Sequence, residues 1–377
     1  GRVRGVIYFG GVLYGFRDNV GATAKRIYKA TSSGWTLLAN PNRLNFTAGS
    51  VAPVVGVAVT KGGASATVKR IAVTSGSWAT ADAAGFLIIG AVTGGPFTAG
   101  ALGGGGTLTV SGAETAVTLP AGGSMEFDIG TVQANPLVYF VDGVGKAHEF
   151  DGDYIAPITT GNATDVPSHV MVHANHLHLS FGNSRQNSSV GNPFDWRALT
   201  GASENKADGT ITGMKRLAGD QSTGAAAIAY DGGTHLLYGL TAADFRLGTF
   251  EDSAGAKVGT LQRLGQLYAL DDRGVVATRA AQEFGNFSVN TLTLNIRPWI
   301  QARRNLVTAS LVNREKNQYR LFFSDGAGLY ITLANGKLLG AGPVQFSDVV
   351  WCACTGETPD GAETAFFGSD DGFVYRL

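Results

Sequence analysis

Cysteine is almost absent from this chain of 377 residues: only Cys352 and Cys354 occur, too few for a disulfide framework. Because residues i and i+2 of a strand share one face, these two are poorly placed to bond to each other, and we interpret them as small core residues. No run of about 18 apolar residues exists, so no membrane span is expected. The first four residues, Gly-Arg-Val-Arg, are not those of a signal peptide.

Charge is also scarce. Asp, Glu, Lys and Arg make up 15% of the chain, well below the usual quarter, and 29 basic residues balance 29 acidic ones. A general attraction to nucleic acid or to an anionic membrane is therefore not predicted. Hydrophobic residues reach 44%, which is enough to build a core and argues against wholesale disorder.

Glycine, by contrast, is abundant at 54 residues and follows no Gly-X-Y period, which indicates many tight turns between short strands. An apolar run, a turn of Gly, Asp, Asn or Ser, and a second apolar run recur along the chain. The seven units span residues 6–14, 137–150, 176–183, 227–238, 267–277, 319–331 and 365–375. From the second unit on, the turns lie near residues 142, 182, 232, 272, 325 and 371.

These turns are about 40 to 50 residues apart, and an all-strand period of that length is typical of propeller blades. The sequence therefore predicts an all-β fold, a β-propeller of six or seven blades. The best helical candidate, residues 241–245, is one turn long. We expect the strands near 6–14 and 366–375 to be neighbours that close the propeller.

The gap between the first and second units is much longer than the others and rich in Ala, Gly and Thr. Between Arg70 and Lys146 it contains no Lys or Arg. Alternating patterns at 66–73 and 107–110 predict strands, and Trp78 favours a folded core over a disordered linker. We expect residues 1–48 to form the first blade, 49–135 a small inserted β-rich domain, and 136–377 the remaining blades.

Histidines give the most suggestive cluster, with His169, His173, His176 and His178 close together and His148 upstream. His176 and His178 would point the same way from a strand and could share a metal. No carboxylate or cysteine completes a ligand set at a recognisable spacing. We interpret these histidines as parts of a blade and expect neither a metal site nor a cofactor.

No catalytic motif is complete. The box Ser-x-Asp-x-Gly-x-Thr-Trp of glycosidase propellers is not matched, because the turn at 369–373 lacks the Thr-Trp end. The turn aspartates are interpreted as caps of the turns. The four glycines at 103–106 are not followed by Lys-Ser or Lys-Thr, so they do not form a phosphate loop. We expect a protein that is not an enzyme.

A basic, partly aromatic segment is the remaining candidate site. It is interpreted as a contact surface for a protein or a nucleic acid. A solvated strand face between two blades is the alternative, since adjacent arginines on a strand point to opposite faces. The residues are Arg297, Trp299, Arg303, Arg304, Arg314 and Lys316. The loop at 192–196, Asn-Pro-Phe-Asp-Trp, is interpreted as a Trp anchor packed between blades.

Several segments, taken in order, resemble the tail nozzle (tail hub, or tail tubular) proteins of short-tailed bacteriophages. They are the strand at 173–180, the Pro-Phe-Asp-Trp loop at 193–196, and the segments 268–275, 317–326 and 368–375. The stretch Ser-Gly-Ser-Trp at 75–78 resembles an insert of related phage proteins. The resemblance implies a propeller platform in a sixfold ring below the portal adaptor, around the channel through which DNA leaves. It implies no catalytic residues.

The expected function is therefore that of a structural virion protein in a phage tail, assembled in the host cytoplasm. Its expected partners are further copies in a homo-hexameric ring, the portal adaptor or head–tail connector, tail fibres or spikes, and double-stranded DNA passing through the lumen without sequence-specific binding. A carbohydrate-binding or glycan-cleaving propeller used in receptor recognition, and a bacterial surface adhesin, are the alternatives. The chain has no initiator Met and ends on a strand-like Val-Tyr-Arg-Leu, so we expect a piece of a longer protein.

Overall fold

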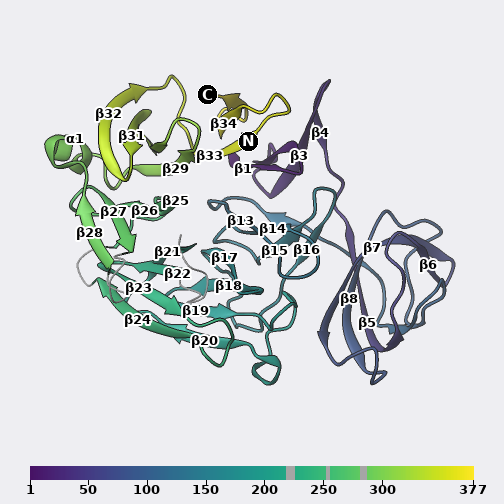
Figure 1. Ribbon diagram of the computed structural model, residues 1–377. Helices are drawn as coiled ribbons and strands as arrows, with labels where there is room; N and C mark the ends of the chain where they lie inside the picture. Colours follow the sequence, from purple (N-terminus) through teal and green to yellow (C-terminus); the bar gives the residue numbers. More distant parts are fainter. Residues whose placement is uncertain (218–225, 252–254, 281–286) are drawn as a thin grey trace.

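The computed structural model describes residues 1–217, 226–251, 255–280 and 287–377. Its strands form a seven-bladed β-propeller with a second β-sheet unit beside it (Figure 1). The predicted all-β propeller is thus confirmed. In each blade the strands pair antiparallel in chain order, and the first strands of neighbouring blades contact one another around the axis.

Blades 1 to 4 contain four consecutive strands each. Blade 1 has β1 (Val3–Phe9), β2 (Val12–Asp18), β3 (Ala24–Thr31) and β4 (Gly34–Leu37). Blade 2 has β13 (Glu126–Gly130), β14 (Leu137–Val141), β15 (His148–Phe150) and β16 (Ile155–Pro157). Blade 3 has β17 (Val170–His173), β18 (His176–Phe181), β19 (Ser184–Asn187) and β20 (Ser203–Lys206). Blade 4 has β21 (Ile211–Arg216), β22 (Ala226–Tyr230), β23 (Gly233–Tyr238) and β24 (Arg246–Glu251).

Blades 5 to 7 complete the propeller. Blade 5 has β25 (Gln262–Leu264), β26 (Gln266–Leu270), β27 (Val275–Ala280) and β28 (Phe287–Thr291). Blade 6 has β29 (Val307–Asn313), β30 (Gln318–Phe323), β31 (Ala327–Ala334) and β32 (Lys337–Gln345). Blade 7 has β33 (Cys352–Glu357), β34 (Glu363–Gly368) and β35 (Val374–Arg376). A short helix, α1 (Arg297–Gln301), connects blades 5 and 6. Among the described residues, no helix is long and apolar enough to cross a bilayer.

The repeated turn motif marks one place in the blade, the hairpin between the second and third strands, in blades 2 to 7. The Asp142 carboxylate accepts hydrogen bonds from the backbone N–H groups of Val144 and Gly145, and Asp271 does the same for Arg273 and Gly274. These aspartates therefore cap turns, as predicted.

The first unit is a different hairpin. Its Gly10 and Gly11 turn joins β1 to β2, one strand earlier than in the other blades. The equivalent turn of blade 1 follows β2, where the Asn19 side chain accepts a hydrogen bond from the Thr23 N–H at 2.9 Å. Because this turn reads Asn-Val-Gly-Ala-Thr, with no Asp-Gly pair, the sequence pattern missed it.

The inserted unit has its own sheet and core. Its strands are β5 (Asn42–Val51), β6 (Ala58–Lys61), β7 (Ala64–Ser75), β8 (Ala83–Ile89), β9 (Gly100–Ala101), β10 (Thr107–Val110) and β11 (Thr115–Ala116). Buried Leu44, Phe46, Val68 and Leu87 form its centre. Both expected boundaries of the insert are wrong. The insert begins before residue 49, because β5 pairs in its sheet from Asn42 on, and it ends before residue 135, because β13 (Glu126–Gly130) belongs to blade 2. The change to an Ala-, Gly- and Thr-rich composition begins inside β5, so the predicted start of the insert lay too far along the chain.

The chain leaves blade 1 for the insert, and returns from it, along one edge of strand β3. One half of that edge of β3, from Tyr28 to Thr31, pairs with β4 before the insert. The other half, Ala24 and Lys25, pairs with β12 (Leu119–Pro120) after it. The two connections therefore lie side by side, and the whole insert occupies a place where an ordinary propeller has a loop.

The propeller closes by packing blade 7 against blade 1, without a strand shared between them. The Val3 N–H donates to the Ser369 carbonyl at 3.0 Å, and Tyr8 stacks on Phe366 with ring centroids 6.3 Å apart. Strand β1 contacts both β33 and β34. The expected neighbourhood of the first and last strands is confirmed.

This closure depends on glycines at the contact. A Cβ at Gly356 would overlap the Tyr8 ring, and one at Gly368 would overlap Val3. We expect Gly356→Ala to lower the free energy of unfolding by about 1–3 kcal/mol, because the added methyl group forces the two blades apart. The measurement is chemical denaturation.

The matched control is Gly342→Ala on β32, where a Cβ would meet nothing within 4 Å. It should leave stability unchanged or raise it slightly, since Ala restricts the unfolded chain more than Gly does. Equal losses in both variants would show that the contact with Tyr8 does not hold the closure.

Candidate functional site

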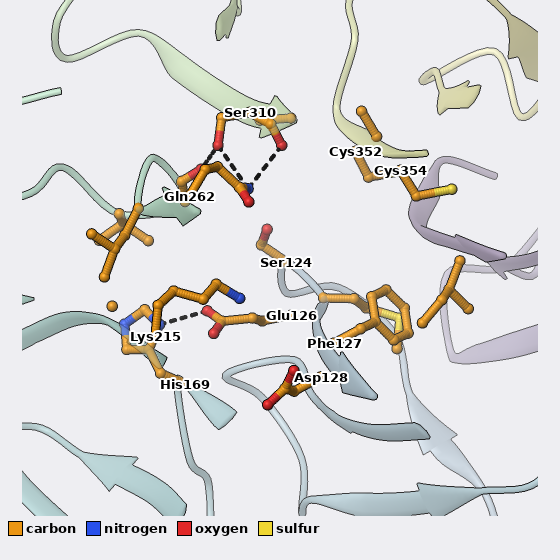
Figure 2. A pocket seen from close by; sticks show the side chains of 18 of the residues that line it. Ser124, Glu126, Phe127, Asp128, His169, Lys215, Gln262, Ser310, Cys352 and Cys354 are labelled. Atoms are coloured by element: carbon orange, nitrogen blue, oxygen red, sulfur yellow. Dashed lines mark hydrogen bonds and ion pairs between the residues drawn. The ribbon is translucent and has the colours of Figure 1, made fainter. Parts of the chain in front are cut away.

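The first strands of the blades surround a central cavity of about 440 Å³, a volume within the range of small-molecule sites. Its polar side, part of which Figure 2 shows, is formed by residues of blades 2 to 6. Glu126 and Asp128 come from β13, Lys215 from β21, Gln262 from β25 and Ser310 from β29. His169 immediately precedes β17, and Ser124 precedes β13. Val6, Ile7, Leu261 and Cys354 supply apolar wall.

Glu126 and Asp128 share one face of β13, because residues i and i+2 of a strand point the same way. The His169 Nδ1–H donates to the Glu126 Oε2 at 2.7 Å. Burial alone would raise the pKa of Glu126, but the neighbouring His169 and Lys215 outweigh it and leave that pKa lowered. Asp128 accepts the Val172 N–H at 2.7 Å and lies 3.6 Å from Arg216, while burial raises its pKa.

Two polar groups in this cavity lack a direct partner in the described part of the chain. The Glu126 Oε1 is buried and accepts no hydrogen bond there. The Lys215 ammonium faces the cavity and forms neither a hydrogen bond nor an ion pair with any described residue, although its charge acts on both carboxylates. The sequence could not reveal this arrangement, because Glu126, His169 and Lys215 belong to three blades.

The two cysteines also lie at this cavity and are free thiols, as predicted. Burial raises the pKa of Cys352 to about 12 and raises that of Cys354 as well. Both are therefore protonated at neutral pH and are poor nucleophiles. Their contribution to the cavity is apolar surface.

A buried ion pair joins the insert to blade 2. Arg70 of β7 contacts both carboxylate oxygens of Glu149 on β15, at 2.6 and 3.1 Å. The Tyr139 hydroxyl donates to the same carboxylate at 3.1 Å, and Arg70 also donates to the Gln133 side chain. The Glu149 side chain is 0% exposed, so this bidentate pair is nearly withdrawn from water.

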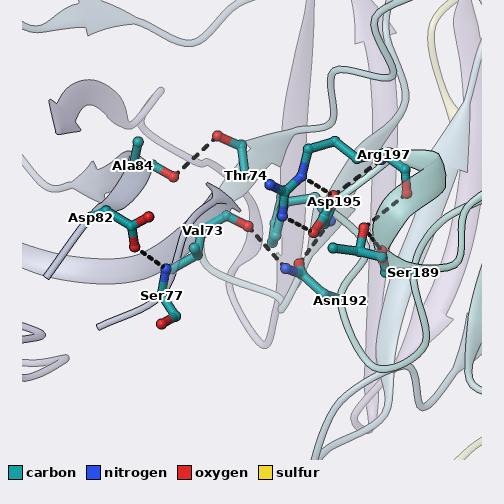
Figure 3. A network of polar contacts seen from close by, with 11 residues as sticks. Val73, Thr74, Ser77, Asp82, Ala84, Ser189, Asn192, Asp195 and Arg197 are labelled. Atoms are coloured by element: carbon teal, nitrogen blue, oxygen red, sulfur yellow. Dashed lines mark hydrogen bonds and ion pairs between the residues drawn. The ribbon is translucent and has the colours of Figure 1, made fainter. Parts of the chain in front are cut away.

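The loop at 192–196 joins the insert to blade 3 (Figure 3). The Asn192 side-chain amide donates to the Val73 carbonyl of β7 at 2.9 Å. Phe194 packs edge-on against Phe86 of β8, with ring centroids 5.6 Å apart. Asp195 holds Arg197 at 2.7 Å. The loop was expected between blades, but it packs between blade 3 and the insert.

The six residues of the predicted contact surface form two separate groups. Arg297 and Trp299 lie on α1; Arg303 follows and pairs with Asp325 at 2.8 Å over the Trp299 ring, and Arg304 pairs with Asp272 at 3.2 Å. Arg314 and Lys316 lie in the turn between β29 and β30. The seven residues of β29 separate the groups by about 20 Å. The prediction that these residues form one patch is therefore wrong. The first group lies on a helix and the turn after it, not on a strand, because Pro298 favours the start of α1.

Apart from His169 at the cavity, the histidines of this cluster, His173, His176 and His178, are buried and serve packing. His176 donates to the Ser188 carbonyl, and His178 donates to the His173 carbonyl and accepts from Arg185 at 2.9 Å. The rings of His176 and His178, which share a face as expected, both pack on Phe245. Throughout the described ranges, no three His, Cys, Asp or Glu side chains are placed to hold a metal ion.

Acid should destabilise the protein through His148, which is buried, stacks on Phe140 and donates to the Lys146 carbonyl. Burial lowers the pKa of His148 from 6.5 to about 4. Between these values the unfolded chain binds a proton that the folded chain does not, so stability falls as pH falls. From pH 7 to pH 5 the loss from this residue should be about 2 kcal/mol.

Chemical denaturation at the two pH values measures this loss. His148→Phe keeps a flat ring beside Phe140 and removes the titration, so its stability should fall by about 2 kcal/mol less between pH 7 and pH 5 than that of the native protein. The prediction fails if both proteins show the same pH dependence.

Removing one partner of the Arg70–Glu149 ion pair should lower the stability of the protein strongly. Arg70→Met leaves the Glu149 carboxylate buried without its cation and should lower the free energy of unfolding by about 3–5 kcal/mol. The double variant Arg70→Met, Glu149→Gln removes the stranded charge and should recover part of that loss. A double variant no more stable than Arg70→Met would rule out the stranded charge as the cause.

No family model matches this sequence, and no curated protein matches it either. Among solved structures, the fold is similar to a chain in the crystal structure of BBS1N in complex with ARL6DN, soaked with mercury. The TM-score is 0.44 at 10% identity, over 67% of this chain and 76% of that chain. A likeness this distant bears on no function, and the strand pairing itself establishes the propeller.

Proposed function

We propose that this chain is a structural virion protein of a phage tail, a subunit of the nozzle or hub ring that surrounds the distal DNA channel and offers a docking platform to fibres or spikes. The observation that carries the proposal is the role of the loop at 192–196. This loop is one of the segments on which the resemblance to tail nozzle proteins depends, and it fastens the insert to the propeller through Asn192 and Phe194.

A platform subunit needs its domains in a fixed relation, and three sets of contacts supply one. Arg70 ties β7 of the insert to Glu149 of blade 2, and Asn192 ties the same strand to blade 3. The strand pairing of β12 with β3 fastens the return of the insert to blade 1. The insert is thus held at three blades, which favours a rigid support over a flexibly tethered domain.

DNA would pass between copies of the chain in this proposal. The propeller's own cavity, about 440 Å³, has the size of a small-molecule site and is lined by side chains of all seven blades. With 29 basic and 29 acidic residues, the chain offers little net attraction to phosphate, which suits a duct through which DNA slides.

Particle imaging of the purified protein tests the ring. Closed rings with sixfold symmetry and a central hole are expected, together with a hexamer mass in solution. A chain that stays monomeric at every concentration imaged, or that binds a host glycan as a monomer, would overturn the proposal in favour of a receptor-binding propeller.

DNA binding gives a separate check. Because affinity that depends on phosphate contacts falls steeply with salt, a sliding channel should bind duplex DNA weakly even at about 50 mM salt, with little further loss at about 200 mM. Strong binding that drops by about 10³-fold over that interval would mean that the chain grips DNA, contrary to the proposed role.

A further inference from the structure

We infer that the central cavity is a binding site for a small carboxylate that carries a hydrogen-bond donor beside its acid group, such as a hydroxy acid or an amino acid, with Lys215 taking the carboxylate and Glu126 taking the donor. This inference concerns the interior of one propeller and does not depend on the proposed ring.

The absence of a direct partner for Lys215 among the described residues indicates an anionic ligand. The Glu126 Oε2 is engaged by His169, and Asp128 is engaged by the Val172 N–H and by Arg216. Lys215 is left without a direct anionic partner among the described residues. Of the other two lining arginines, Arg216 pairs with Asp128 and Arg314 is exposed to water. A ligand carboxylate at the Lys215 ammonium would supply the direct anionic partner that this side chain lacks among the described residues.

The unpaired Glu126 Oε1 indicates that the ligand carries a hydrogen-bond donor. It is a buried carboxylate oxygen that no described group satisfies, and buried polar atoms in folded proteins nearly always have a partner. In Figure 2 the Glu126 and Lys215 side chains extend from different strands into the same part of the cavity, and the charge of Lys215 acts on the Glu126 carboxylate. A molecule with an acid group and a neighbouring hydroxyl or ammonium group would supply a partner to each of them.

The other walls limit the size of the molecule. The Gln262 amide nitrogen is held by Ser310 at 3.0 Å, which fixes this side chain at the cavity. Ile7, Leu261 and Cys354 offer apolar surface to a short alkyl group. A few convergent polar groups with an apolar wall, in about 440 Å³, are the usual composition of a site for a small molecule.

Three probes with the same carbon skeleton test the inference: propionate, L-lactate and L-alanine. Only the last two carry a donor next to the carboxylate. Isothermal titration, or ligand-observed NMR for weak binding, should show L-lactate or L-alanine binding the whole purified chain at least about 10-fold more tightly than propionate, the factor that one added hydrogen bond to a charged group gives.

Variants assign the two roles. Lys215→Met should abolish binding of all three probes, and Glu126→Gln should reduce the better probe to the level of propionate. Lys337→Met, on the exposed start of β32 in blade 6, is the matched control and should bind as the native protein does. Thermal melting of each variant confirms that it is folded, and Lys215→Met alone suffices if Glu126→Gln does not fold.

Three results would overturn the inference: no binding of any probe at about 10 mM, above the weak millimolar range; equal affinity for propionate and the donor-bearing acids; or binding unchanged in Lys215→Met. Imaging of Lys215→Met separates this inference from the proposed function, because loss of the site should leave any ring of subunits intact.

Discussion

The face-to-face contact between blade 7 and blade 1 is the constraint on which the rest of the structure depends. No strand is shared between the first and last blades, so side-chain packing and a few backbone hydrogen bonds must resist the opening of the propeller. Gly356 and Gly368 allow the sheets to approach closely enough for Tyr8 and Val3 to fill the contact. The central cavity exists only while this closure holds, because its lining comes from both sides of it.

Blade 1 must also hold the insert in place, in addition to closing the propeller. Its β3 strand divides one edge between β4 and β12, and the buried Lys25 of β3 pairs with Asp142 of blade 2 at 2.7 Å. A buried pair of this kind is costly to break, so the register of blade 1 against blade 2 is strongly fixed. The insert, its root in blade 1 and its contacts with blades 2 and 3 thus belong to one connected body.

The turn residues made the blades predictable from the sequence, whereas the central cavity and the contacts of the insert were not predictable. Aspartates such as Asp142 and Asp271 cap their turns through adjacent backbone N–H groups, so spacing alone revealed six of the seven blades in register. The first unit was placed one hairpin early because Gly10 and Gly11 are also good turn residues. Helix α1 escaped notice because five residues give no helical period.

The cavity could not be found in this way, for a geometric reason. Glu126 and Lys215 approach each other only because blades 2, 3 and 4 are wrapped around an axis, and their separation along the chain carries no motif. The basic residues show the reverse case: Arg304 and Arg314 are close in sequence, yet a strand of the propeller separates them. In a propeller, residues near the axis gather from distant segments while residues within one segment are spread from one end to the other.

In this geometry the proposed ring and the inferred ligand site would use different surfaces of the chain. A ring of subunits would use the rims of the blades and the insert, whereas a ligand would use the interior faces of the first strands. The two surfaces share the fold and few side chains, and function resides in such sites rather than in the fold itself. A polar cavity around Lys215 and Glu126 makes no evident contribution to a ring contact, and an interior filled with apolar side chains would stabilise the propeller better. The presence of these charges where they contribute least to packing is therefore the strongest reason to look for a ligand at the axis.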